Sequence, residues 1–184
     1  LIVEGTLAAC VAAEALARQG RRVVLAAGAC SLPCEIVVCR RPWVSAREIE
    51  GLPEPWRRAF SKCIASRTVG GQRLLNLARV ATAVEDVLLD AGVTIFYGMT
   101  PCGVARASDG SVAGVVFGGK FGLRAVVAGS VVDCTPFATV TALAGGEVRS
   151  RVGRDIVVHL SCKANVAAKN RSEEHTSELQ SQSH

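Results

Sequence analysis

Apolar residues open the chain in short continuous runs, which a small-residue turn and a helix-like stretch separate. Leu1–Val3 and Arg21–Ala27 carry the runs, and Leu7–Gln19 lies between them with apolar side chains spaced to fall on one helical face. Strands without polar alternation are typical of a parallel sheet covered on both faces. Gly20 stands where a helix C-terminal cap would stand. The pattern therefore predicts a strand–helix–strand unit with parallel strands.

The regular apolar pattern stops in residues 28–71, where four prolines interrupt the chain. This segment predicts an irregular excursion from the sheet, with one short helix within residues 54–66. Gln72–Ala91 then has the widest apolar face of the chain and predicts a helix that Gly92 ends. Val93–Tyr97 follows and predicts a further strand of the main sheet.

Residues 102–128 carry hairpin signals in place of continuous apolar runs. Two apolar stretches flank Asp109-Gly110, a pair that favours a tight hairpin turn. The sequence therefore predicts an antiparallel β-meander separate from the main sheet. Val131–Cys134 returns to the main sheet as a buried strand, and residues 137–146 predict a short helix. The fold class expected is α/β, a Rossmann-like sheet with an inserted meander.

Domain organisation follows from where these patterns end. Residues 1–150 are expected to form one domain, and residues 151–170 to begin a further segment. The chain starts inside a strand without Met, so we interpret it as a fragment of a longer protein. Residues 171–184 break with the preceding composition, and their RSEEHTSELQS run resembles a translated sequencing adapter. We therefore interpret this tail as an artefact without packed structure.

Charge and cysteine usage narrow the functional classes. The net charge of +5 comes from scattered basic residues, without the aromatic interleaving or module that nucleic-acid binding needs. No apolar run reaches membrane-spanning length without interruption. The eight cysteines include no CxxC pair, and their only cluster is Cys30, Cys34 and Cys39. We interpret them as thiols rather than metal ligands or disulfides, which favours a cytoplasmic protein.

Three stretches together resemble a known family. They are LIVEGTLAACVAAEALARQGRRVVLA, VEDVLLDAGVTIFYGMTPCGVARASDGSVAGVVF and AGSVVDCTPFATVTALAG. Their order and turn chemistry resemble the FAD-dependent oxidoreductases with two dinucleotide-binding domains, of the fumarate reductase and succinate dehydrogenase type. The resemblance implies FAD as cofactor, a FAD-binding strand–helix–strand unit, and flavin-mediated transfer of hydride or electrons.

The resemblance also assigns the cofactor contacts. Gly5, Ala8 and Ala9 would hold the pyrophosphate at the start of the first helix, and Thr135 would close on FAD after the returning strand. The remaining fingerprint positions differ from the family pattern. Glutamate and threonine replace glycines at positions 4 and 6, no carboxylate ends the second strand, and proline and phenylalanine follow Thr135.

These departures leave alternatives open. The chain is expected to be a FAD-dependent oxidoreductase that lacks its substrate domain. The alternative is a cofactor-free, non-catalytic member of the fold that acts as a structural or partner-binding module; a third reading is a domain for a different nucleotide. Asp133 is expected to support a turn, His159 to be a strand or surface residue, and Arg40-Arg41 to be solvated or to bind an anion. No residue is assigned as a catalytic acid or base, and substrate and oligomeric state stay undetermined.

Overall fold

The computed structural model describes residues 1–149 of the chain. His159 and the predicted segments 151–170 and 171–184 lie outside the described residues. The elements in chain order are β1 (Ile2–Val3), α1 (Leu7–Arg18), β2 (Val24–Ala27), the π-helix η1 (Cys34–Val38), β3 (Trp43–Ser45), α2 (Ala46–Glu50), α3 (Trp56–Lys62), β4 (Ile64–Val69), β5 (Gln72–Leu75), α4 (Leu77–Asp90), β6 (Thr94–Tyr97), β7 (Thr100–Arg106), β8 (Val112–Gly119), β9 (Gly122–Val127), β10 (Val132–Asp133) and α5 (Thr139–Leu143).

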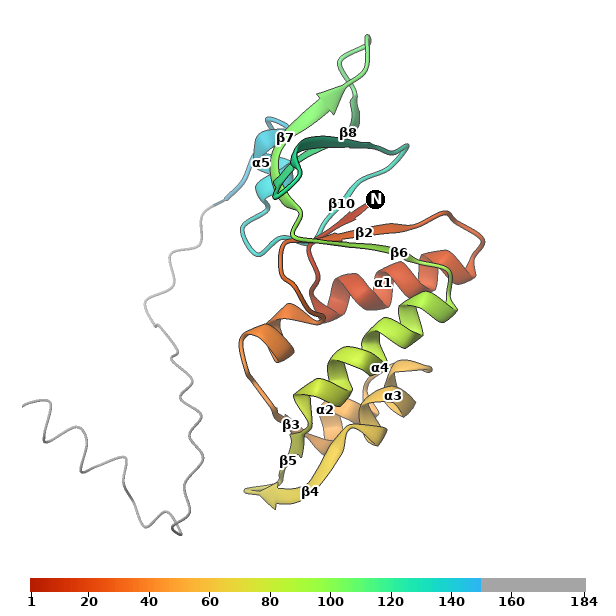
Figure 1. The fold of residues 1–184 in the computed structure, drawn as a ribbon, viewed down its shortest axis with the longest axis vertical. Helices are drawn as coiled ribbons and strands as arrows, with labels where there is room; N and C mark the ends of the chain where they lie inside the picture. The colour runs from red at the N-terminus through yellow and green to blue at the C-terminus, as the bar shows by residue number, and fades with distance from the viewer. Residues whose placement is uncertain (150–184) are drawn as a thin grey trace, which may run out of the picture. The chain divides into compact units, whose positions relative to one another are not determined.

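A four-stranded parallel sheet forms the centre of the described region (Figure 1). Its order is β10-β1-β2-β6, and each neighbouring pair is parallel. Ile2 pairs with Leu25 on one side and with Val132 on the other, so the first strand of the chain lies between two later ones. The four predicted sheet strands therefore lie in one sheet, and the parallel arrangement is confirmed.

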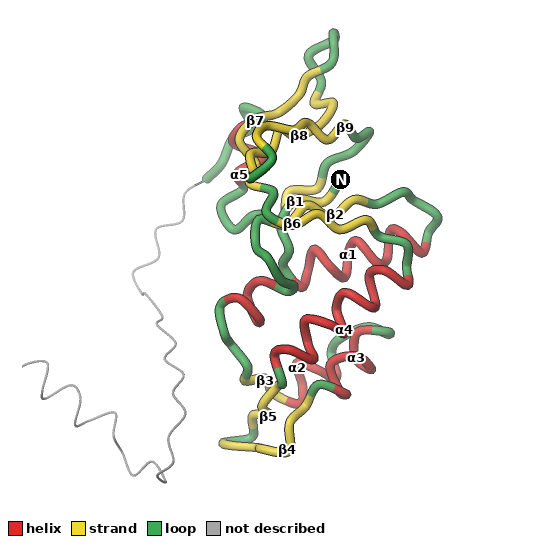
Figure 2. The backbone as a smooth tube through the Cα atoms, viewed as in Figure 1, coloured by secondary structure: helices red, strands yellow, loops and turns green. Residues whose placement is uncertain are grey.

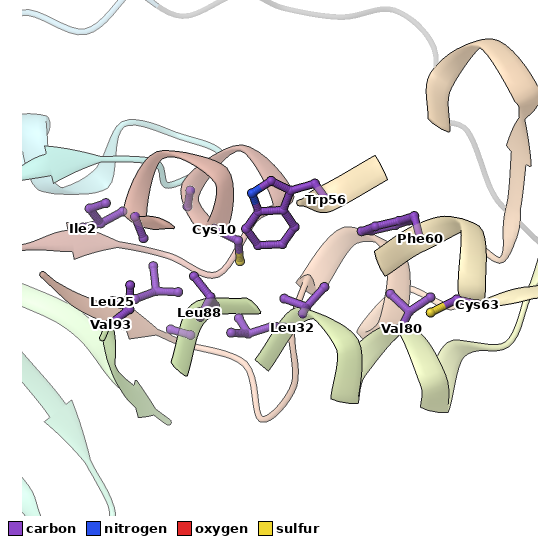
Figure 3. Packing of buried hydrophobic residues seen from close by; sticks show 14 of the residues in the cluster. Ile2, Cys10, Leu25, Leu32, Trp56, Phe60, Cys63, Val80, Leu88 and Val93 are labelled. Atoms are coloured by element: carbon purple, nitrogen blue, oxygen red, sulfur yellow. The ribbon is translucent and has the colours of Figure 1, made fainter. Parts of the chain in front are cut away.

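Helices α1 and α4 pack against one face of this sheet. Ala9, Cys10 and Ala13 of α1 and Val80, Val84 and Leu88 of α4 belong to one buried apolar cluster with Ile2 and Leu25. Figure 3 shows how Trp56 and Phe60 of α3 continue the cluster away from the strands. The apolar stripes that the periodicity predicts are therefore the faces that become buried.

The meander covers the other face of the sheet. Val115 and Phe117 of β8 are fully buried and share a second cluster with Val3 and Ala26 of the central strands. The meander order is β7-β8-β9, with antiparallel pairing throughout (Figure 2). Gly110 has φ +83, the left-handed value that the predicted hairpin turn requires. A separate antiparallel meander is thus confirmed.

The prediction of one helix over Gln72–Ala91 is wrong at its beginning. Gln72–Leu75 is strand β5, which pairs antiparallel with both β3 and β4, and α4 begins only at Leu77. Asn76 ends the strand and caps the helix, because its Oδ1 accepts a hydrogen bond from the Arg79 N–H at 3.1 Å. The apolar periodicity extends into the strand, but pairing with two partner strands overrides it.

Residues 28–71 contain more regular structure than an irregular excursion. They hold η1, β3, α2, α3 and β4, each only a few residues long. Ser45 and Glu48 form a reciprocal capping box that begins α2. Trp56 and Phe60 are buried against the helices of the main core. The prolines therefore separate short packed elements and do not abolish structure.

Candidate functional site

The turn between β1 and α1 is the candidate site, and its backbone is tightly held. The Glu4 N–H donates to the carbonyl of Ala26 at 2.8 Å, which ties the turn to β2. Thr6 is the N-cap of α1, and its Oγ1 accepts from the Ala9 N–H at 3.2 Å. Threonine in place of a fingerprint glycine therefore satisfies one of the free N–H groups at the helix start.

Glu4 combines a glycine-like backbone with a negative side chain. Its φ of +89 is a value that favours glycine, the residue that the family pattern has at this position. Its Oε1 accepts a hydrogen bond from the Gly5 N–H at 2.8 Å. A carboxylate thus occupies a backbone donor that faces phosphate in a dinucleotide-binding turn.

A second carboxylate, that of Glu35, reaches the same helix terminus from η1. Its Oε1 accepts a hydrogen bond from the Leu7 N–H at 2.7 Å, across 28 residues of sequence. Its Oε2 accepts a hydrogen bond from the thiol of Cys34 at 3.6 Å. Glu35 was not predicted from the sequence, because a lone acidic residue in a proline-broken segment gives no signal of this contact.

The segment before Glu35 packs directly onto the turn. The Cys34 N–H donates to the Gly5 carbonyl at 2.9 Å. A Cβ added at Gly5 would overlap Cδ2 of Leu32 and would lie 3.0 Å from Cβ of Ala27. Gly5 is therefore required so that the side chain of Leu32 can pack directly against the backbone of the turn.

The end of β2 carries no replacement for a ribose-binding acid. Ala27 is fully buried, so its side-chain position faces the core rather than a ligand. Gly28 is exposed, and a Cβ there would lie 3.4 Å from Oε2 of Glu4. The nearest carboxylate at this strand end is therefore that of Glu4, which comes from the neighbouring turn.

The predicted cofactor contacts lie at the carboxyl ends of adjacent strands. Gly5 and Ala9 are buried, whereas Ala8 is exposed in the first turn of α1. Thr135 follows β10, the neighbour of β1 in the sheet. These positions place the four residues on the same edge of the sheet, and their role as FAD contacts stays a prediction.

Asp133 organises the turn that follows β10. Its Oδ1 accepts from the N–H and hydroxyl of Thr135, and its Oδ2 accepts from the N–H and hydroxyl of Thr141. Burial alone would raise the pKa of Asp133, but these hydrogen bonds hold the pKa below its ordinary value. The prediction that Asp133 supports a turn is confirmed, and the Thr135 hydroxyl is already engaged within the protein.

A cavity of about 230 Å³ adjoins Glu35. Its lining includes Leu7, Glu35, Trp43, Phe60 and the exposed Arg41. Arg41, one of the two arginines considered as anion ligands, thus lines the same cavity as Glu35, whose carboxylate binds the start of α1.

The thiols near the turn are held in their neutral form. Burial, followed by the charges of Glu35 and Glu4, raises the pKa of the Cys34 thiol to about 12. Burial likewise raises the pKa of the Cys10 thiol. Within residues 1–149, no group of three or more His, Cys, Asp or Glu side chains could hold a metal ion.

None of the helices within residues 1–149 combines the length and the apolar character that crossing a bilayer requires.

Comparison with known families assigns most of the chain to one family. The family described as FAD dependent oxidoreductase matches residues 1–172. A search of curated proteins returned no match.

Solved structures share the fold at low identity. THI4 from Thermovibrio ammonificans is 24% identical with a TM-score of 0.56, over 77% of this chain and 59% of its own. A geranylgeranyl bacteriochlorophyll reductase-like protein from Thermoplasma acidophilum is 15% identical with a TM-score of 0.55, over 78% of this chain and 41% of its own. OxyS anhydrotetracycline hydroxylase from Streptomyces rimosus is 18% identical with a TM-score of 0.55, over 78% of this chain and 33% of its own. The chain therefore spans less than two thirds of each of these proteins.

Proposed function

The chain belongs to the FAD-dependent oxidoreductase family, and from that premise we propose that it contributes the nucleotide-binding domain of an oxidoreductase. FAD is the cofactor of this family, and when bound it carries hydride or electrons between a substrate and an acceptor. We assign residues 1–150 to this domain and residues 151–170 to the start of a further segment. A complete enzyme would need substrate-binding residues from outside this domain.

The parallel sheet carries this proposal. β1 runs directly into the N-cap of α1 at its carboxyl end, and β2 and β10 flank β1 on either side. Ligands of open parallel sheets bind outside the carboxyl ends of the strands, where a helix N-terminus favours an anion. Gly5, Ala8, Ala9 and Thr135 lie at that edge and are the proposed FAD contacts.

The side chains at this edge do not fit a pyrophosphate in the arrangement seen here. Glu4 and Glu35 place two carboxylates on the backbone donors, and Leu32 fills the approach to Gly5. This observation favours a second candidate function, that of a cofactor-free member of the fold with a structural or partner-binding role. No reaction step is therefore assigned to residues of this chain.

Flavin content separates the two functions. The full-length protein is purified without added cofactor, and its visible flavin absorbance is compared with protein concentration, before and after reconstitution with FAD. Stoichiometric flavin and substrate-linked bleaching of its absorbance would support the oxidoreductase. Absence of flavin after reconstitution would instead support the cofactor-free module.

The compartment is part of the same proposal. Cys10 and Cys63 are buried free thiols, which is typical of a reducing environment. We therefore place the protein in the cytoplasm, and fractionation of cells that express the full protein tests this placement.

A further inference from the structure

The hydrogen bond between Glu35 and the Leu7 N–H has the chemistry of ligand binding. The first N–H groups of a helix have no partner within the helix, and they attract anions. In nucleotide-binding strand–helix–strand units a phosphate oxygen takes this position. Here the acceptor is a carboxylate of the chain itself, at 2.7 Å.

Several contacts hold Glu35 in that position. Leu32 and Pro33 are buried, and the Cys34 N–H donates to the Gly5 carbonyl at 2.9 Å. The Cys34 thiol donates to the second oxygen of Glu35. A π-helix, a rare conformation that is frequent at functional sites, presents the side chain. The segment Leu32–Glu35, which we call the plug, therefore docks on the turn as one unit.

Two further groups cap the same turn. The Glu4 carboxylate accepts from the Gly5 N–H, and the Thr6 hydroxyl accepts from the Ala9 N–H. The N–H groups of Gly5, Leu7 and Ala9 thus have side-chain acceptors within the protein, and an incoming diphosphate would meet two negative charges.

We propose that the plug is an autoinhibitory element in which Glu35 substitutes for the pyrophosphate of a dinucleotide, so that a diphosphate ligand binds only when Glu35 leaves the start of α1. The identity of that ligand as FAD rests on the proposed function, but the competition between Glu35 and a diphosphate does not. The cavity beside Glu35 gives the side chain space to withdraw, and Arg41 in its lining supplies a cation. A hydrogen bond to a charged group is worth a factor of about 10 to 100 in an equilibrium.

The test uses the full protein with Glu35→Ala, Glu35→Gln and the control Glu50→Gln. Glu50 is an exposed glutamate of α2 that does not line the cavity, so its substitution removes the same charge away from the turn. Inorganic pyrophosphate is the probe, titrated by calorimetry at constant ionic strength. We expect Glu35→Ala to bind pyrophosphate at least tenfold more tightly than the wild type, and Glu50→Gln to match the wild type.

A second variant and a second measurement keep the test valid if Glu35→Ala folds poorly. Glu35→Gln keeps a neutral oxygen for the Leu7 N–H, and we expect it to fold and to show a smaller gain. Amide hydrogen exchange at Leu7 is expected to be slow in the wild type, faster in Glu35→Ala without ligand, and slow again when pyrophosphate is added. Equal pyrophosphate affinity in the wild type and both variants, or unchanged exchange at Leu7, would overturn the proposal.

Titration with FAD distinguishes this proposal from the proposed function. A gain for pyrophosphate without FAD binding in any variant would contradict the oxidoreductase and leave the plug supported. Stoichiometric FAD in the wild type that Glu35→Ala leaves unchanged in affinity would contradict the plug and support the oxidoreductase.

Discussion

Single side chains set the electrostatics at the start of α1. Glu4 adopts φ +89 while its carboxylate binds the Gly5 N–H, and Glu35 binds the Leu7 N–H. Each contact satisfies a donor that would otherwise favour an anionic ligand. Together they explain why the turn between β1 and α1 presents negative charge to an incoming phosphate.

The thiol of Cys34 reports on these charges. Its pKa is raised from 9.0 to about 12, first by burial and then by Glu35 and Glu4. The folded protein therefore keeps this proton through the range in which the unfolded chain loses it. This contribution to stability is complete below pH 9.0 and is lost as the pH rises towards 12.

We expect iodoacetamide to modify Cys34 at least tenfold more slowly than Cys102 at mildly alkaline pH, because only the thiolate reacts. Cys102 is an exposed cysteine of β7 and serves as the matched control. Substitution of Glu35 by Gln should accelerate the reaction at Cys34 alone, as measured by mass spectrometry of each peptide. Equal rates at both cysteines in the wild type would refute the raised pKa of Cys34.

At the scale of elements, a buried polar contact joins α1 to α3. Glu14 is only 4% exposed, and its Oε2 accepts from the indole N–H of Trp56 at 3.3 Å. Its Oε1 pairs with Arg18 one turn along α1. Trp56 itself is fully buried, next to Cys10 in Figure 3. This contact anchors the proline-rich segment to the first helix of the sheet layer.

The two tryptophans offer a matched test of that contact. We expect Trp56→Phe to lower the free energy of unfolding by about 1–3 kcal/mol, because it leaves a buried carboxylate oxygen without its donor. Trp43→Phe should change it by less than about 0.5 kcal/mol, since Trp43 is 39% exposed. Urea unfolding of the full protein measures both. Similar losses for the two variants would show that the indole N–H of Trp56 contributes nothing specific.

At the scale of the whole described region, one sheet separates two apolar layers. The cluster of α1 and α4 lies on one face, and Val115 and Phe117 of the meander cover Val3 and Ala26 on the other. The central strands β1 and β2 are therefore buried from both sides, as continuous apolar strands require. Removal of either layer would expose the same strands.

Two phenylalanines of the meander test this architecture. Phe117 is fully buried against the sheet, whereas Phe121 is 43% exposed. We expect Phe117→Ala to lower the free energy of unfolding by about 3–5 kcal/mol, with faster amide exchange in β1 and β2. Phe121→Ala should lower the free energy of unfolding by clearly less. Loss of protection confined to the meander in Phe117→Ala would show that the meander does not stabilise the sheet.

Local patterns determined the order and type of the main elements. Continuous apolar runs indicated the strands of the parallel sheet, and Asp109-Gly110 indicated the meander hairpin, because strand burial and turn geometry depend on neighbouring residues. The family resemblance, which three stretches between Leu1 and Gly146 carry, is confirmed by the family match over residues 1–172. Asp133 was correctly expected to support a turn, since its partner Thr135 is two residues away.

Contacts between distant segments determined the rest. Gln72–Leu75 became a strand only because β3 and β4 supply its partners, and its own periodicity favoured a helix. Glu35 reached the Leu7 N–H from 28 residues away, and Leu32 closed over Gly5 from the same segment. The departures of the turn from the glycine fingerprint are visible in the sequence, but tertiary packing decided which side chains satisfy its backbone donors. The physical reason is that the first N–H groups of a helix have no partner within the helix and donate to any acceptor that the fold brings within reach.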